Sequence, residues 1–151
     1  MRRAYDATHI NRVVNHPEVF KWVSMPGIDV LDLSAAVTNP DNVLLENEHG
    51  GFIFMNTGGG HYEVHTQFLP SGRAQSLQAA REAAEHMFTQ TDCVAIDTYV
   101  PDGNIAALNL VKAMNFTHTG RDGSWTYPDG RTVAVDWFTL TKDQWICRQQ
   151  P

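Results

Sequence analysis

The 151-residue chain has few cysteines, no long apolar run and no block of charge of one sign. Its two cysteines, Cys93 and Cys147, lie far apart in the sequence, a usage typical of reduced, structural thiols in a cytosolic protein. No apolar run approaches the roughly 20 residues that a membrane helix needs, and the first residues lack the apolar stretch of a signal peptide. We therefore expect a cytoplasmic protein with no membrane partner, in which neither thiol is catalytic.

Clusters of basic residues are also absent. The formal net charge is −6, with 5 basic and 8 acidic side chains in residues 1–75 and 6 and 9 in residues 76–151. Proteins that bind nucleic acid tightly without sequence preference rely on a basic surface. We therefore do not expect strong non-specific nucleic-acid binding. A polyanionic cofactor is still compatible with this charge, because backbone amides at a helix N-terminus bind phosphate.

The composition is that of a globular protein. Hydrophobic residues make up 42% of the chain and charged residues 19%. No internal repeat, low-complexity segment or linker divides the sequence. A length of 151 residues suits one domain with its own core and is short for two. We therefore expect a single domain that spans residues 1–151.

The N-terminal part of the chain has the periodicity of short helices. It predicts a helix at 8–15, capped by Thr8, and a second at 17–23, where Pro17 suits the first turn. The segment 28–37 reads either as a short strand or as a loop that covers the core.

Strand and helix signals then alternate. Strands are predicted at 42–48, 51–56 and 61–69, and the short glycine-containing connections between them are typical of an antiparallel meander. The remaining pattern predicts, in order, a helix at 72–89, a strand at 94–100, a helix at 104–114, strands at 116–127 and 132–140 and a helical turn at 142–147. The order predicts an α/β (α+β) fold: a mixed, mostly antiparallel central sheet with helices on both faces.

The strand-to-helix junction at 68–76 is the most informative segment. The first amides of a helix have no intrahelical partner, and the helix dipole favours negative charge there. Gly72 and Ala74 leave room for a pyrophosphate near the backbone, and Arg73 offers a cation. The alternative is an ordinary strand–helix turn with Ser71 as the cap.

A second strand-to-helix junction lies at 100–104. Asn104 opens the following helix, where it is either an ordinary helix cap or a cofactor contact. Asp102 is an alternative cap.

Together, the two junctions resemble the GNAT superfamily of acyl-coenzyme A-dependent N-acyltransferases, whose members share this order of elements. The family's pyrophosphate loop, Arg/Gln-x-x-Gly-x-Gly/Ala after the fourth strand, is matched at Gly72 and Ala74. Its second pattern, Asn-x-x-Ala-x-x-Leu-Tyr-x-x-x-Gly-Phe, is matched at four positions: Asn104, Ala107, Leu110 and Phe116. The resemblance covers residues 42–140, and it extends to the compact stand-alone members encoded by tailed bacteriophages.

The resemblance implies an acetyl-CoA-dependent N-acetyltransferase, in which a primary amine attacks the thioester directly in a ternary complex. It implies that the cofactor-binding residues are Phe68, Leu69, Ser71, Gly72, Arg73, Ala74, Gln75 and Asn104. Many relatives pair as homodimers, so a homodimer is also an expectation.

Three positions depart from the family patterns. Leu69 stands where the loop usually has Arg or Gln, and Asn115 stands where the second pattern has Gly. Asn tolerates the left-handed conformation at a helix end, so Asn115 is an understandable substitute. Val111 stands where many relatives have a Tyr near the coenzyme sulfur, so the chain lacks that general acid.

Transfer to an amine needs a base for the amine proton and a polarised thioester carbonyl. His65 and Glu63 share one face of the strand that leads into the loop, and they are the candidate bases. A free histidine has a pKa of about 6.5, so it can accept a proton at neutral pH. Tyr99 and Tyr127 are the candidate acids for the departing thiolate. The resemblance implies that a backbone amide of the fourth strand polarises the carbonyl.

Several aromatic side chains are candidates to line an acceptor pocket, although core packing also explains each of them. They are Trp22, Trp125, Tyr127 and Trp137.

The pattern His61-x-Glu63-x-His65 invites a metal-binding interpretation. The first and last of these residues are about 13 Å apart on a strand, whereas zinc binds its ligands at about 2 Å. One ion therefore does not reach all three side chains, and we expect no metal site.

Two questions stay open at this stage. The acceptor is either a small-molecule amine or an amine on a macromolecule, such as a protein or a modified DNA base. The alternative to catalysis is a degenerate GNAT fold that acts as a binding module, which Leu69 and Val111 favour.

Overall fold

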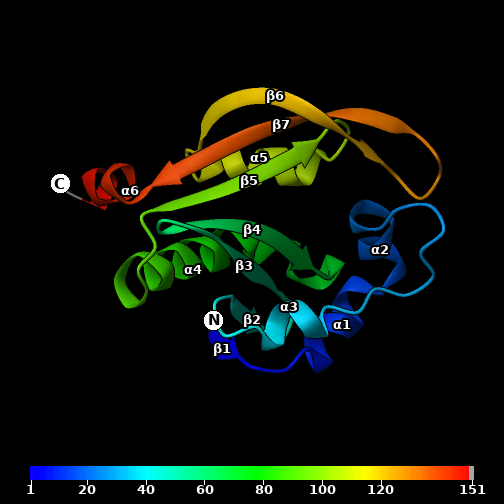
Figure 1. Ribbon diagram of the computed structural model, residues 1–151, viewed down its shortest axis with the longest axis horizontal. Helices are drawn as coiled ribbons and strands as arrows, with labels where there is room; N and C mark the ends of the chain where they lie inside the picture. The colour runs from blue at the N-terminus through cyan, green and yellow to red at the C-terminus, as the bar shows by residue number, and fades with distance from the viewer. Residues whose placement is uncertain (150–151) are drawn as a thin grey trace.

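One mixed sheet organises the chain, which a computed structural model describes over residues 1–149 (Figure 1). The elements in chain order are β1 (Arg2–Ala4), α1 (Thr8–Val14), α2 (Pro17–Val23), α3 (Ser34–Thr38), β2 (Val43–Asn47), β3 (Gly50–Gly58), β4 (His61–Phe68), the 3₁₀ segment η1 (Pro70–Gln75), α4 (Ser76–Gln90), β5 (Ala95–Pro101), α5 (Ile105–Ala113), β6 (Thr117–Thr126), β7 (Thr132–Thr141) and α6 (Lys142–Gln149).

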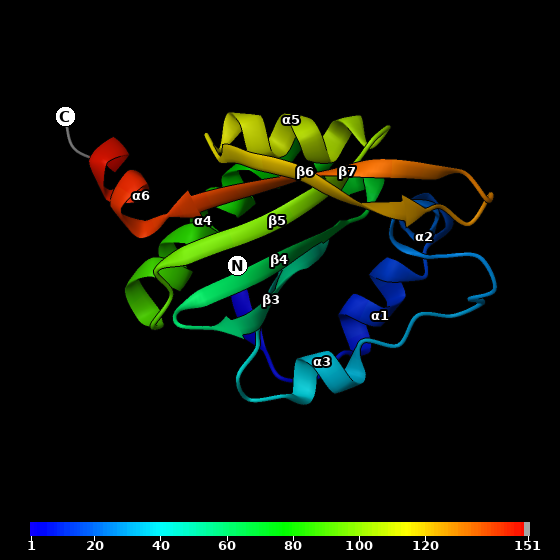
Figure 2. The same ribbon diagram turned by 45° about the horizontal axis from the view of Figure 1, so that its top comes forward.

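The seven strands lie in the order β1-β2-β3-β4-β5-β7-β6. Every neighbouring pair is antiparallel except β4 and β5, which run parallel because α4 crosses over between them. The predicted mixed, mostly antiparallel sheet is confirmed. Figures 1 and 2 show α1, α2 and α3 grouped on one side of the molecule, apart from α4 and α5.

Hydrophobic cores on both faces of the sheet hold these layers together. Four small residues of α4 let it approach the sheet closely and pack against the aromatic side chains of β3 and β4: Ala79, Ala80, Ala83 and Ala84. On the other face, the apolar side chains of α1 pack on Leu44 and Ile53. Side chains alternate along β4, so Val64 faces α4 while His65 and Gln67 face the N-terminal helices.

Three local predictions in the N-terminal part were wrong. Strand β1 was missed, because a three-residue edge strand carries too short a pattern. The segment 28–37 is neither a strand nor only a loop, since α3 begins at Ser34. Thr8 does not cap α1; it is the first helical residue, and its N–H donates to Asp6 Oδ1 at 3.0 Å.

The predicted helix at 72–89 also begins later than expected. Residues Pro70–Gln75 form η1, in which the Gly72 N–H donates to the Leu69 carbonyl at 3.0 Å, and α4 begins at Ser76. The buried face of α4 consists of Ala79, Ala80, Ala83, Ala84, Met87 and Phe88.

The expected conformation of Asn115 agrees with the fold. Asn115 has φ of 60°, the left-handed conformation that its place after α5 requires. Cys93 is buried, and burial raises the pKa of its thiol to about 11, which leaves it unreactive. None of the helices within residues 1–149 combines the length and apolar character needed to cross a membrane.

Candidate active site

The sheet splits at the one place where two strands run parallel. Strands β4 and β5 pair from His61–Ala95 as far as Glu63–Asp97, and beyond these residues the two strands diverge (Figure 1). One side-chain contact crosses the split just past that point, where Thr98 Oγ1 donates to the Val64 carbonyl at 3.0 Å. The carbonyl of Val64 therefore points into the split between the two strands. Because backbone direction alternates along a strand, the N–H and carbonyl of Thr66 also face the split.

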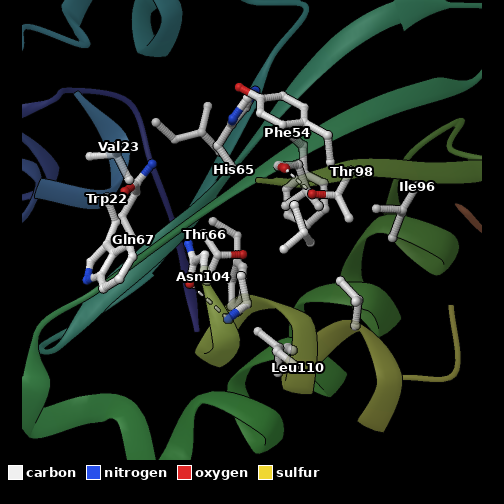
Figure 3. Close-up of a pocket in the computed structure, with 18 of the residues that line it drawn as sticks. Trp22, Val23, Phe54, His65, Thr66, Gln67, Ile96, Thr98, Asn104 and Leu110 are labelled. Atoms are coloured by element: carbon white, nitrogen blue, oxygen red, sulfur yellow. Dashed lines mark hydrogen bonds between the residues drawn. The ribbon is translucent and has the colours of Figure 1, made fainter. Parts of the chain in front are cut away.

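A cavity of about 250 Å³ occupies this split and is lined from both faces of the sheet. On the α4–α5 side its wall includes Ala84, Ala107 and Leu110. On the other side its wall includes Trp22 and Val23 from α2 (Figure 3). We refer to these as the α5 half and the α2 half of the cavity. Since the cavity passes through the sheet, two molecules can approach one point from opposite faces.

The loop at 24–33 forms part of the α2 half, to whose wall it contributes Leu31 and Leu33. Two asparagines of α1 and its C-terminal end hold this loop in place. Asn15 Oδ1 accepts from the Leu31 N–H at 2.8 Å, and Asn11 Oδ1 accepts from the Leu33 N–H at 2.8 Å. Side-chain amides therefore replace the sheet partners that this extended segment lacks.

His65 and Glu63, the predicted bases, are brought together at the mouth of the split. His65 Nε2 lies 2.8 Å from Glu63 Oε2, and both side chains are partly buried. A carboxylate only accepts hydrogen bonds, so Nε2 carries the proton and Nδ1 has the free lone pair. His65 lines the cavity, and this arrangement is that of a base oriented by a carboxylate.

Tyr99, a predicted acid, lies beside this pair. Its ring centroid is 5.6 Å from that of His65, and its ring also packs against Trp125 and Trp137. Burial raises the pKa of Tyr99, and the negative charge of Glu63 raises it further. The hydroxyl therefore keeps its proton at neutral pH and is able to donate it.

Tyr127, the other predicted acid, is not brought into this group. Its hydroxyl donates to the Asp102 carbonyl at 2.9 Å, its ring packs edge-on against Trp22, and it is absent from the residues that line the cavity. Tyr127 therefore packs behind Trp22, a residue of the cavity wall.

A polar groove of about 440 Å³ lies next to the cavity. Glu63, which contacts His65, forms part of the wall of this groove. Asp97, Asp122 and Trp137 also line the groove. His61 pairs with Asp97 at 2.9 Å, whereas His65 pairs with Glu63, so the His61-x-Glu63-x-His65 pattern is divided between two contacts. Among the residues described, no group of three or more His, Cys, Asp or Glu side chains is placed to hold a metal ion.

The predicted pyrophosphate segment has a different internal structure from the one expected. Gly72 is buried against His49, and a Cβ at Gly72 would collide with the side chain of His49. The Leu69 N–H donates to the His49 carbonyl, and Ser71 Oγ lies 3.0 Å from His49 Nδ1. Packing on His49 therefore explains the glycine without any ligand, and two of the expected amide donors, those of Leu69 and Gly72, are already engaged.

The other predicted cofactor residues of this segment point in several directions. Phe68 is buried against Phe52, and Ala74 and Gln75 are exposed. Arg73 reaches across to α2, where its Nη2 donates to the Glu18 carbonyl at 3.2 Å. This segment lies outside the lining of the cavity.

Asn104 is both a helix cap and a cavity residue. Its Oδ1 accepts from the Ala107 N–H at 3.2 Å at the start of α5, and its side chain lines the cavity (Figure 3). Val111, where the family pattern has Tyr, is buried and lines the same wall, so an apolar surface replaces that hydroxyl.

Sequence reasoning missed one residue, Gln67. It is 6% exposed, and it lines the cavity on the same face of β4 as His65. The period-two pattern of β4 placed it on that face, but a glutamine there reads as solvated until the α2 half is seen to cover it.

Solved structures of acetyltransferases resemble this chain. A spermidine N-acetyltransferase from Vibrio cholerae, in complex with CoA and spermine, matches with a TM-score of 0.75 and 14% identity, covering 91% of this chain and 90% of that chain. A protein described only provisionally as an acetyltransferase matches with a TM-score of 0.74 and 15% identity, covering 97% of this chain and 85% of that chain. A point mutant of the Vibrio cholerae enzyme matches with a TM-score of 0.66 and 14% identity, over 77% and 75% of the two chains.

No protein-family model and no curated protein sequence matches the chain. At identities of 14–15% the structural likeness establishes the fold. The chain has the GNAT fold of these acetyltransferases, as the two sequence junctions predicted.

Proposed function

We propose that this chain is an N-acetyltransferase that moves an acetyl group from acetyl-CoA to a primary amine within a ternary complex. The observation that carries the proposal is the cavity that passes through the split between β4 and β5, with His65 and Tyr99 beside it. A thioester entering from one face and an amine entering from the other meet there, which direct transfer requires. The neighbour in complex with CoA and spermine supports a donor and an acceptor of this kind.

The α5 half of the cavity suits the thioester arm of the coenzyme. Its wall is apolar, and small residues such as Ala80, Ala84 and Ala107 leave room for a narrow chain. The backbone N–H of Thr66 faces the split, so it is the donor we assign to the thioester carbonyl oxygen. The fit is poorer at η1, where the Gly72 and Leu69 amides already donate to protein carbonyls.

Side chains of this protein then carry out two proton transfers. His65 Nδ1 accepts the proton of the attacking amine, and Glu63 stabilises the imidazolium that forms. Tyr99 donates its hydroxyl proton to the departing thiolate. When bound, acetyl-CoA supplies the carbonyl carbon to which the new C–N bond forms as its C–S bond breaks, leaving an N-acetyl amide and free CoA.

A small molecule is the acceptor class that we favour, since Leu31 and Leu33 of the loop at 24–33 form part of the wall of the α2 half. An amine on a macromolecule has to reach past this loop. One observation favours the alternative of a binding module without catalysis. The Leu69 N–H is occupied by the His49 carbonyl, in a segment where relatives hold the pyrophosphate.

The test is a thermal melt with and without millimolar acetyl-CoA, because a ligand that binds only the folded state raises the melting temperature. Ala107→Phe fills the α5 half and should abolish the shift. Ala106→Phe, its matched control on the exposed face of α5, should retain it. A shift followed by acetylation of an amine supports the enzyme. A shift without transfer to any amine supports the binding module, and no shift at all contradicts both.

A further inference from the structure

The α2 half of the cavity is uncharged. Its wall consists of aliphatic side chains, the aromatic residues Trp22, Trp125 and Tyr99, and two polar residues, His65 and Gln67. Among the described residues that line the whole cavity, none is Asp, Glu, Lys or Arg. A second charge on the acceptor would lose its water there without gaining a partner, which disfavours binding. The carboxylates lie instead in the neighbouring groove that includes Asp97.

Two polar atoms of this wall have no hydrogen-bond partner. Gln67 Oε1 is buried and accepts from no donor, and the buried Trp125 Nε1–H donates to no acceptor. Gln67 lies beside Trp22 and Val23 in Figure 3. A buried polar atom left unpaired destabilises the folded state, and folded proteins almost always pair such groups. The two atoms have opposite needs: one needs an N–H or O–H, and the other needs an oxygen.

We infer that the acceptor is an amine that also carries an uncharged amide on a compact apolar or aromatic body. An amide supplies both an N–H for Gln67 Oε1 and a carbonyl oxygen for Trp125 Nε1, and it brings no charge. The inference rests on the proposed acetyl transfer and narrows its substrate class. It sets the acceptor apart from polyamines, whose further ammonium groups would be buried without a carboxylate.

An amine next to an amide has two sources in the cell: a small amino amide, or the N-terminus of a peptide. Both present the same groups to Gln67, Trp125 and His65. Chain length separates them, because Leu31 and Leu33 of the loop at 24–33 form part of the wall of the α2 half, which a longer chain has to pass.

The experiment compares four acceptors at saturating acetyl-CoA: phenylalaninamide, a tetrapeptide with N-terminal phenylalanine, β-phenylethylamine and spermidine. The first and third share the amine and the ring and differ by the amide. We expect kcat/KM for phenylalaninamide to exceed that for β-phenylethylamine by about tenfold or more, because the analogue leaves buried groups unpaired. Spermidine should be the poorest. Transfer to the tetrapeptide at a similar rate would assign the amide to a peptide N-terminus.

Gln67→Leu keeps the volume and removes the hydrogen bonds, so it should lower kcat/KM for phenylalaninamide about tenfold more than for β-phenylethylamine. Trp125→Phe keeps an aromatic ring, removes the N–H and should act in the same direction. Gln78→Leu, on the exposed face of α4, is the matched control and should leave the ratio unchanged. Thermal melts of each variant verify folding.

Binding is measured separately, by the acceptor-induced melting shift in the presence of CoA. If acetyl transfer occurs but spermidine or β-phenylethylamine is preferred, or if Gln67→Leu leaves the ratio unchanged, the amide inference is wrong and the acetyltransferase stands. If phenylalaninamide binds in a Gln67-dependent way without being acetylated, the amide subsite stands and the proposed reaction fails. If no amide binds or reacts, the inference is overturned.

Discussion

His65 and Glu63 stand two residues apart on β4, and the His65 Nε2–Glu63 Oε2 contact of 2.8 Å leaves Nδ1 as the free nitrogen of the ring. Side chains at i and i+2 of a strand share a face, so the contact follows directly from the local sequence. The position of this pair in the fold does not follow from the local sequence. The pair matters because β4 and β5 separate just beyond Glu63, which places the imidazole beside a cavity.

Removing the imidazole tests this arrangement. His65→Gln should lower kcat for acetyl transfer by about 100-fold or more, because a general base contributes 10²- to 10⁴-fold. Glu63→Gln should have a smaller effect, since Glu63 orients the base. Steady-state kinetics measures both. The control is His118→Gln, since His118 forms a similar contact of 3.0 Å with Asp136 on the surface of the β6–β7 hairpin. An equal loss of kcat in His118→Gln would contradict a catalytic role for His65.

Gly72 is predicted to act through packing on His49. Gly72→Ala places a methyl group against His49 Cβ and should cost about 1–3 kcal/mol of unfolding free energy. Adding His49→Gly to the same chain removes that Cβ and should recover most of the loss. Urea denaturation of the four proteins in a double-mutant cycle measures the coupling. Gly120→Ala, at a position with open space around it, is the control. Additive effects would show that His49 is not the obstacle.

The loop at 24–33 should depend on Asn15. Its side chain exchanges two hydrogen bonds with Leu31, accepting at 2.8 Å and donating at 2.7 Å. Asn15→Ala should lower the free energy of unfolding by about 1–3 kcal/mol. Limited proteolysis should show faster cleavage within the loop. Asn109→Ala, on the exposed face of α5, should change neither measurement. An unchanged cleavage rate in Asn15→Ala would contradict the role given to the asparagine.

Alkaline pH should destabilise the protein through Tyr62. Burial raises its pKa to about 12, and the hydrogen bond and charge of Asp92 contribute to the shift. Below pH 10 the phenol is protonated in both states. Between pH 10 and about 12 only the unfolded tyrosine ionises, so stability is lost as the pH rises. Urea denaturation at pH 9, 10 and 11 should show this fall, and a smaller one for Tyr62→Phe. An identical fall in the variant would assign the effect to other groups.

The sequence alone was sufficient for most of the fold. Alternation along β4 and the alanine stripe of α4 are local patterns, and they predicted a strand and a helix whose junction resembles the GNAT family. The ends of elements were less predictable. Residues Pro70–Gln75 form a 3₁₀ segment where the sequence predicted the first turn of a helix. Helix α3 has only five residues, too few for a periodic signal. The likeness to phage-encoded members and the cytoplasmic location stay predictions, as does a homodimer.

The candidate site was likewise only partly predictable from the sequence. Local sequence determined that His65, Glu63 and Gln67 share a face, because side-chain direction alternates with every residue of a strand. Only the tertiary structure decided what that face meets. The β4–β5 pairing ends at Glu63 and Asp97 because the strands diverge, and α2 with its loop then covers the opening. Long-range packing therefore buried Gln67 and left its carboxamide oxygen without a partner, since no local pattern specifies which distant element covers a strand.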